Sequence, residues 1–244
     1  MKNPSILTQA SNSTYLIMGV IKISSGISNR IFLPLLLLLF CAFPAFGQLT
    51  RAQIINNGVP YTTFAWTASA ANIKYNVNCS PVGTINTPNW IITGNNTSMP
   101  YCWGGFSSLT SFPIGINAGK GTGNNNTSTS GDCCESCALG VDCSGFVSRA
   151  WGLSAKQSTT TLPGISSAIT LPSVQPGDIL NVSGSHVRLV ESNYGTGYYR
   201  VMEASGADWK TAYHTYSAAN LTSYSPRCWN NLIGGCTALA CGTP

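Results

Sequence analysis

Charged side chains are scarce in this chain of 244 residues, since only 8% are Asp, Glu, Lys or Arg. Histidine is rarer still, with two residues in the whole sequence. The basic residues form no cluster with interleaved aromatic side chains, which argues against a nucleic-acid-binding protein. With so few imidazoles, the sequence predicts no metal site. Asn, Ser, Thr, Gly and Tyr abound instead, which fits a secreted protein with a polar but uncharged surface.

One long apolar run is present, and it predicts a secretory signal. Residues 31–43 are apolar and contain Pro34, in an N-terminal region without acidic residues. The run is too short and too interrupted for a comfortable transmembrane helix. Ala45 and Gly47 supply the small residues that signal peptidase requires before its cleavage point. We therefore expect residues 1–47 to be removed, which gives a secreted or periplasmic protein without a stable membrane anchor.

The 197 residues after this point are enough for one domain with its own core. They carry nine basic and seven acidic residues, a net charge of +2. Residues 48–98 are turn-rich, and we expect an N-terminal extension that packs on a main domain formed by 99–244. Within the main domain, 106–141 is predicted to be a loop-like insertion, and 228–241 a cysteine-rich tail.

The cysteine count predicts one free thiol. The sequence has ten cysteines, and removal of the signal takes Cys41 and leaves nine. Export favours disulfides, and an odd number leaves one cysteine unpaired. We expect Cys143 to be that residue and the other eight to form bridges, with Cys79 tying the extension to the core. Adjacent Cys133 and Cys134 should reach different partners, among which the tail cysteines are candidates.

A Cys-x-x-Cys pair lies within the insertion, at Cys134 and Cys137. Without a second such pair or a nearby histidine, disulfide partners are favoured over zinc. A thiol–disulfide exchange protein that depends on these two cysteines is an alternative.

Cys143 begins a segment with helical periodicity. Apolar residues recur three, four, seven and eight positions after it, along one face of a short helix. Asp142 is a suitable N-cap, and Gly152 is a suitable stop. The helix dipole favours an anion at this end, so the pattern predicts a stabilised thiolate. The competing interpretation is a disulfide half or a small buried side chain.

A nucleophilic cysteine needs a base, and His186 is the better placed histidine. Residues 179–182 and 186–190 read as a hairpin with a tight turn, and 198–203 as a third strand. A second turn centred between Tyr194 and Gly195 would place Glu203 directly opposite His186, where its carboxylate can hold the imidazole.

Two other polar residues are weaker candidates. Glu191 lies five positions along the strand from His186, so its side chain is expected on the other face. His214 lies in a polar, tyrosine-rich segment and is expected to be a solvated surface histidine.

Four motifs, in this order, resemble those of the NlpC-type cell-wall peptidases, which are papain-like cysteine hydrolases. They are Pro100-Tyr101-Cys102-Trp103-Gly104-Gly105, Val141-Asp142-Cys143-Ser144-Gly145-Phe146-Val147, Gln175-Pro176-Gly177-Asp178-Ile179-Leu180 and Ser185-His186-Val187. The resemblance implies an α+β fold in which the nucleophile helix packs on an antiparallel sheet. It covers about two thirds of the predicted mature chain.

The resemblance also implies roles for individual residues. Cys143 would be the nucleophile, His186 the base, and Glu203 the third polar residue, at a position where the family often has His. The hydroxyl of Tyr101 would lie beside the nucleophile, and Trp103 would help to shape the cleft. The motif neighbours Asp142 and Ser144 complete the predicted substrate-binding set.

The family's usual substrate is the peptidoglycan stem peptide, cut at a γ-D-glutamyl–diamino acid bond without metal or cofactor. An N-acetylmuramoyl-L-alanine amidase or an acyl transferase on the same fold is the nearest alternative. A catalytically silent, disulfide-stabilised cell-wall-binding protein is another. The chain departs from the family in the separation of 42 positions from Tyr101 to Cys143, several times the usual spacing, and in the tail. A monomer is assumed.

Overall fold

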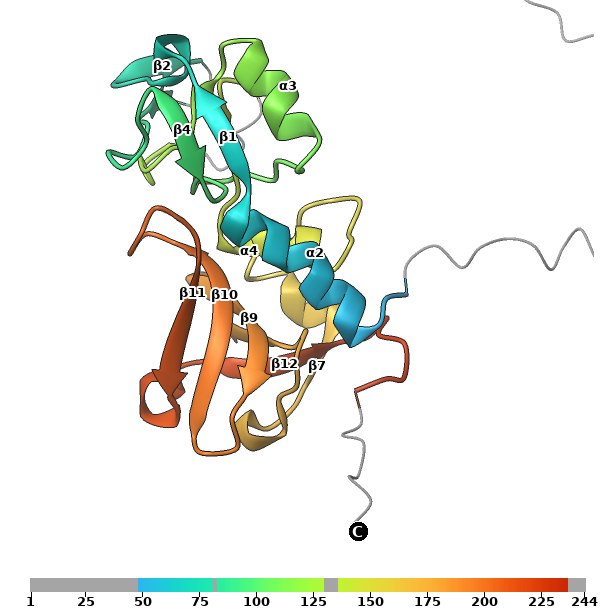
Figure 1. Ribbon diagram of the computed structural model, residues 1–244. Helices are drawn as coiled ribbons and strands as arrows, with labels where there is room; N and C mark the ends of the chain where they lie inside the picture. Colours follow the sequence, from blue (N-terminus) through green and yellow to red (C-terminus); the bar gives the residue numbers. More distant parts are fainter. Residues whose placement is uncertain (1–47, 81–82, 130–135, 237–244) are drawn as a thin grey trace, which may run out of the picture. The chain divides into compact units, whose positions relative to one another are not determined.

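The computed structural model describes residues 48–80, 83–129 and 136–236, and this part of the chain is a mixed α+β structure (Figure 1). The predicted signal, 1–47, lies outside the described residues, as do Cys133, Cys134 and Cys241. The helices and strands are α2 (Arg51–Thr63), β1 (Ala65–Ala68), β2 (Val77–Cys79), β3 (Gly83–Ile85), β4 (Gly94–Thr97), α3 (Ser111–Asn117), β5 (Gly121–Thr122), β6 (Ala138–Leu139), α4 (Cys143–Ala150), β7 (Ser166–Ala168), β8 (Ile179–Val182), β9 (His186–Asn193), β10 (Tyr198–Ser205), β11 (Lys210–Ser217) and β12 (Ser225–Trp229).

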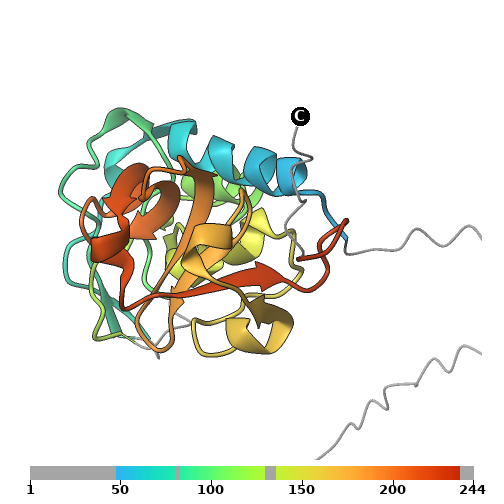
Figure 2. The same cartoon turned by 90° about the horizontal axis from the view of Figure 1, so that it is seen from below.

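A six-stranded sheet in the order β11-β10-β9-β8-β12-β7 carries the second half of the chain, and all its neighbouring strands are antiparallel. Val187, Leu189 and Met202 belong to the buried cluster that includes Phe146 and Val147 of α4. Figure 2 shows α2 running alongside this sheet, and α2 packs against both α4 and β10. The helix that begins at Cys143 thus lies beside an antiparallel sheet, which agrees with the expected α+β class.

Helix α2 replaces much of the turn-rich segment that the sequence predicted. Thr50 and Gln53 form a capping box: Gln53 N donates to Thr50 Oγ1 at 3.2 Å, and Thr50 N donates to Gln53 Oε1 at 2.8 Å. Its buried residues, Ile54, Gly58 and Tyr61, follow a helical spacing. Weak apolar periodicity and Pro60 concealed this helix, which tertiary packing stabilises.

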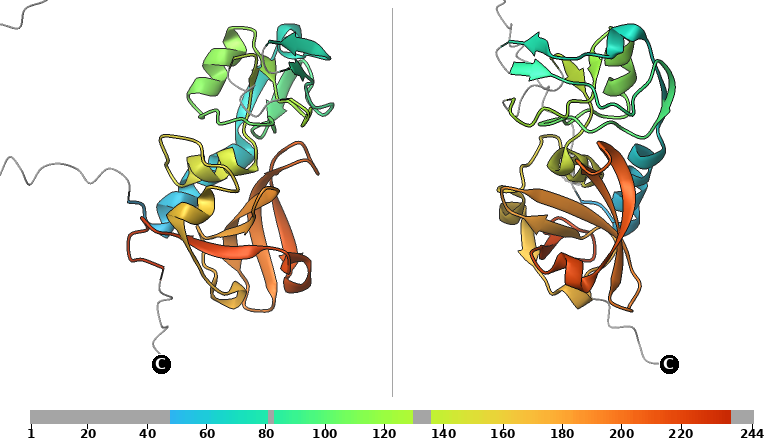
Figure 3. Two further views of the ribbon diagram at one scale, coloured as in Figure 1. Left: turned by 180° about the vertical axis from the view of Figure 1, so that it is seen from behind. Right: turned by 90° about the vertical axis from the view of Figure 1, so that its left-hand side faces the viewer.

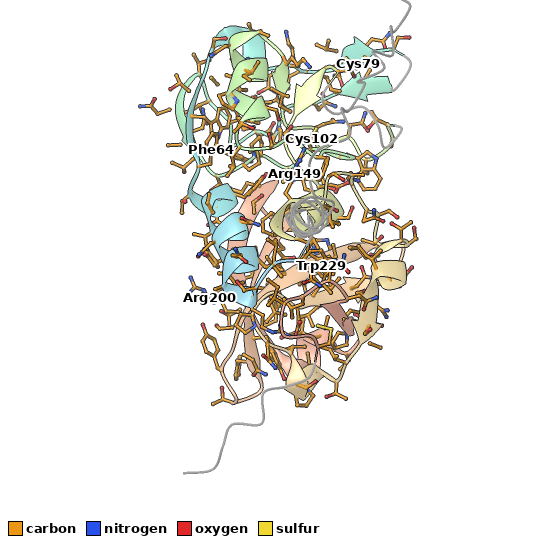
Figure 4. The ribbon with its side chains drawn as sticks, turned by 90° about the vertical axis from the view of Figure 1, so that its right-hand side faces the viewer. Phe64, Cys79, Cys102, Arg149, Arg200 and Trp229 are labelled. Atoms are coloured by element: carbon orange, nitrogen blue, oxygen red, sulfur yellow. A yellow bond between two sulfur atoms is a disulfide. The ribbon has the colours of Figure 1, made fainter. Side chains whose placement is uncertain are left out.

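The predicted insertion 106–141 is not a plain loop. It contains α3, whose Phe112 and Ile116 are buried, and a parallel pairing of β5 with β6. A disulfide between Cys79 and Cys137 fastens β6 to the N-terminal part of the chain, as expected for Cys79 (Figure 4, where Cys79 is labelled). From β6 the chain continues within four residues into α4, so the insertion supports the start of the cysteine helix.

The disulfides bear on two expectations. Cys137 is bonded to Cys79, as favoured for a disulfide partner, and this speaks against the alternative of a redox pair with Cys134. Cys228 is bonded to Cys236 within the tail rather than to the insertion. Cys102 is also disulfide-bonded, and within the described ranges Cys143 is the one free cysteine, as predicted. Such bonds indicate an oxidising environment.

No helix in residues 48–80, 83–129 or 136–236 is long and apolar enough to cross a membrane. Figure 3 shows the same elements from two further sides; β12 is a strand of the six-stranded sheet, between β8 and β7.

Candidate active site

The start of α4 is held by a buried carboxylate. Asp142 is the N-cap: its Oδ1 accepts from Gly145 N at 2.6 Å and from Ser144 Oγ at 3.0 Å. Its Oδ2 accepts from Gly104 N at 3.1 Å and lies 2.8 Å from Lys156 Nζ. The predicted N-cap is confirmed, and the helix ends at Ala150, two residues before Gly152, whose φ is positive at 67°. The side chains of Asp142 and Ser144 therefore contact each other and the loop at Gly104.

This close packing requires glycine at position 145. A Cβ atom there would lie 1.9 Å from the carbonyl oxygen of Gly105, which is backbone and cannot move aside cheaply. Gly145→Ala is therefore expected to lower the free energy of unfolding by about 2–3 kcal/mol or more, the range for overpacked sites. The matched control is Gly164→Ala, because a Cβ at Gly164 meets nothing within 4 Å. Urea denaturation of both variants checks this, and equal stabilities would contradict it.

Cys143 is buried, with 7% of its surface exposed. Burial raises the pKa of the Cys143 thiol to about 12, the charge of Asp142 adds to the effect, and the backbone N–H groups of Val187 and Ser144 oppose it. The expected thiolate at the helix N-terminus is therefore corrected for the resting protein, in which the thiol is neutral. A base must take its proton.

His186 directly precedes Val187, whose backbone N–H acts on the thiol, and strand β9, which begins at His186, packs against α4, which begins at Cys143. The Nε2 atom of His186 lies 2.5 Å from Oε2 of Glu203, so this nitrogen carries a proton. In the neutral ring, Nδ1 is then the free basic nitrogen. The predicted contact between His186 and Glu203 is present.

The strand register behind this contact differs from the prediction. The hairpin of β8 and β9 pairs as expected, with Val182 opposite His186. Between β9 and β10, however, a bulge lies at Arg200/Val201, and Val201 pairs with Val190. Continuing this ladder places Glu203 opposite Arg188, two residues from His186. A shift of two keeps both side chains on one face, so the contact survives as a diagonal one.

Glu203 is 1% exposed, and its carboxylate contacts several charged and polar side chains of the site. Arg188 Nε donates to its Oε2 at 2.9 Å, and Tyr216 Oη donates to its Oε1 at 2.7 Å. Burial alone would raise the pKa of Glu203, but the hydrogen bond from His186, the charge of Arg188 and the Tyr216 hydroxyl outweigh it. Together they lower that pKa to about 2. The carboxylate is therefore ionised at any ordinary pH.

The lowered pKa of Glu203 predicts that the protein becomes less stable as the pH falls. The stabilisation from its ionised form is complete above the ordinary value of 4.5 and is lost as the pH falls towards about 2. The free energy of unfolding should decrease across this interval. Glu203→Gln should flatten the decrease, although it lowers stability at neutral pH. Urea denaturation of the original protein and the variant between pH 2 and pH 7 measures the free energy of unfolding. Parallel plots of this free energy against pH would contradict the prediction.

His214 is not the solvated surface histidine that the sequence predicted. Its Nδ1 lies 2.9 Å from Glu203 Oε1, and its Nε2 lies 2.8 Å from Asp208 Oδ2. Strand β11 pairs directly with β10, Val201 opposite His214, which brings His214 to the same carboxylate as His186. Glu191 pairs with Arg200 at 3.8 Å instead, as a residue of the other face.

Aromatic side chains surround the thiol. Tyr101 is buried, and its ring meets that of Trp209 edge-on at 5.2 Å. Burial raises the pKa of Tyr101, as do the charges of Cys143 and Asp142, so its hydroxyl stays a neutral donor. Tyr224 meets the ring of His186 at 6.5 Å. The indole N–H of Trp103 donates to Thr129 O at 3.0 Å, so this residue is anchored to the insertion.

Three participants were missed from the sequence: Arg188, Tyr216 and Tyr224. The guanidinium of Arg188 lies between the two tyrosine rings, 3.9 Å from Tyr216 and 4.4 Å from Tyr224. Strand alternation alone places Arg188 on the face of His186, and this signal could have found it. Tyr216 and Tyr224 depend on how β11 and the following turn fold back.

Within the described ranges, no group of three His, Cys, Asp or Glu side chains could hold a metal ion. Comparison of the chain with protein-family models, with curated proteins and with solved structures gives no match. The case for a function therefore depends on the geometry of the site.

Proposed function

We propose that this protein is a secreted, papain-like cysteine hydrolase of the NlpC type that cleaves an amide bond in peptidoglycan stem peptides. The observation that carries the proposal is a free cysteine at the N-terminus of a helix that packs against the strand of a histidine, whose ring is held by a buried carboxylate. A thiol, a base and a group that orients the base are the parts that nucleophilic catalysis requires.

The chemistry follows from these positions. His186 Nδ1 takes the proton of Cys143 as the sulfur attacks the carbonyl carbon, and Glu203 stabilises the imidazolium that forms. The C–N bond then breaks, and His186 gives its proton to the leaving amine. Water, deprotonated by His186, hydrolyses the thioester and restores the thiol. The neutral hydroxyl of Tyr101 and the backbone N–H groups at the start of α4 are the donors for the oxyanion.

The burial of the thiol supports a second candidate function. Cys143 is only 7% exposed, which also suits a catalytically silent protein that binds the cell wall. For the hydrolase, substrate binding must open access to the sulfur. An amidase or acyl transferase would use the same three residues and differ in the bond that it cuts.

The test is mass spectrometry of purified peptidoglycan fragments after incubation with the protein, beside a Cys143→Ala control. We expect new fragments that are absent with the control, and their masses identify the bond. Unchanged fragments with both proteins, while intact-mass labelling under denaturing conditions shows Cys143 free, would contradict a peptidoglycan hydrolase and favour the binding protein.

A further inference from the structure

Glu203 lies between the only two histidines of the sequence. Its Oε2 is 2.5 Å from Nε2 of His186, and its Oε1 is 2.9 Å from Nδ1 of His214. The other ring nitrogen of His214 is 2.8 Å from Asp208 Oδ2. His186, Glu203, His214 and Asp208 therefore form a continuous line from β9 across β10 and β11 to the turn that joins β10 and β11.

His214 faces Glu203 at 2.9 Å without an aligned hydrogen bond. Among the described residues, Nδ1 of His214 is a buried nitrogen without an aligned hydrogen-bond partner. An imidazole that presents both nitrogens to carboxylates satisfies them best as the doubly protonated cation. The side chain of His214 is 26% exposed and that of Asp208 is 35% exposed, against 1% for Glu203. Proton exchange with solvent is therefore easiest at this outer end of the line.

The other groups that face Glu203 keep their charge between pH 5 and pH 8. Arg188 stays a cation. The pKa of Tyr216 is raised to about 12 by burial and by the carboxylate, and burial also raises that of Tyr224. Among the described residues around Glu203, the two histidines are of the side-chain type that ordinarily changes charge in this interval.

We propose that His214 is a positioning residue whose protonation sets how strongly Glu203 supports the protonated form of His186. With His214 neutral, the carboxylate is shared by His186 and Arg188 alone. When His214 is protonated, its positive charge partly neutralises the Glu203 carboxylate. It also repels a second positive charge on His186, so the protonated form of His186 is less stable. The catalytic consequence rests on the proposed function, whereas the coupling between the two histidines does not.

The coupling is measured by proton NMR titration of the two imidazole rings in the purified protein. We expect His214→Gln to move the titration midpoint of His186 to higher pH by about half a unit or more. His186→Gln should move the midpoint of His214 upward by the same amount, because coupling between two binding sites is reciprocal. Asp208→Asn, a change at a partly exposed residue, should lower the midpoint of His214 and identifies its signal.

Midpoints that stay within about 0.2 unit in both glutamine variants would overturn the inference. If fragments are released in a Cys143-dependent way, the acidic limb of the kcat/KM profile should move with the His186 midpoint in His214→Gln. If the protein hydrolyses peptidoglycan but the histidine midpoints do not move, the coupling is refuted and the proposed function is supported. Coupled midpoints without hydrolysis support the coupling and refute the proposed function.

Discussion

Replacing Glu203 by alanine is expected to lower the free energy of unfolding at neutral pH by about 3–5 kcal/mol. The reason is that Glu203 is 1% exposed and satisfies several groups at once. Its removal leaves the guanidinium of Arg188, 12% exposed, with an unpaired Nε, and leaves the Tyr216 hydroxyl and His186 without their acceptor. Breaking a buried ion pair from one side costs the desolvation of the partner that remains. Urea denaturation at pH 7 measures the loss.

Glu191 is the matched control for this variant, since it lies on the adjacent strand and also pairs with an arginine. Its carboxylate is 24% exposed, Arg200 is 40% exposed, and the two charges are 3.8 Å apart. Surface pairs of this kind contribute about 0–1 kcal/mol, so Glu191→Ala should change stability by less than 1 kcal/mol. A similar loss in both variants would show that Glu203 has no special electrostatic role.

Replacing His186 by alanine is expected to reduce kcat/KM for release of peptidoglycan fragments by about 10³–10⁴-fold. Without the imidazole, the proposed acceptor for the proton of a thiol whose pKa is about 12 is lost. The leaving amine also loses its proton donor. Rates are measured by quantitative mass spectrometry of the released fragments at pH 7.

Because the proposed nucleophile and base act in the same chemical step, the losses of activity from replacing each should not add. The double variant is therefore a control within the same experiment. Cys143→Ala should lose at least as much activity as His186→Ala, and the double variant should lose little more than either single variant. Additive losses, or more than a tenth of the activity retained in His186→Ala, would exclude His186 as the base.

Local signals in the sequence predicted the elements that hold the thiol and the base. The Asp142 N-cap and the Gly152 stop bound a helix within ten residues, so short-range hydrogen bonds determine where it begins and ends. The hairpin between β8 and β9 is likewise set by its tight turn. The odd cysteine count singled out the thiol that remains free.

Other parts of the site could not be predicted because they depend on contacts far apart in the sequence. The bulge at Arg200/Val201 changes the register by an amount that no local pattern reveals. Helix α2 and the buried residues of α3 are stabilised by packing rather than by their own periodicity. The fastening of the insertion by Cys79 and Cys137 spans 58 residues.

The sequence by itself determined a cysteine at a helix start, a histidine at a strand start and a carboxylate on the same sheet face, because each follows from a period of two or 3.6 residues. Only the tertiary structure decided that the thiol is buried and neutral and that Glu203 serves both histidines. Burial and the pairing of β11 with β10 produce these two properties, and both arise only when distant segments pack together.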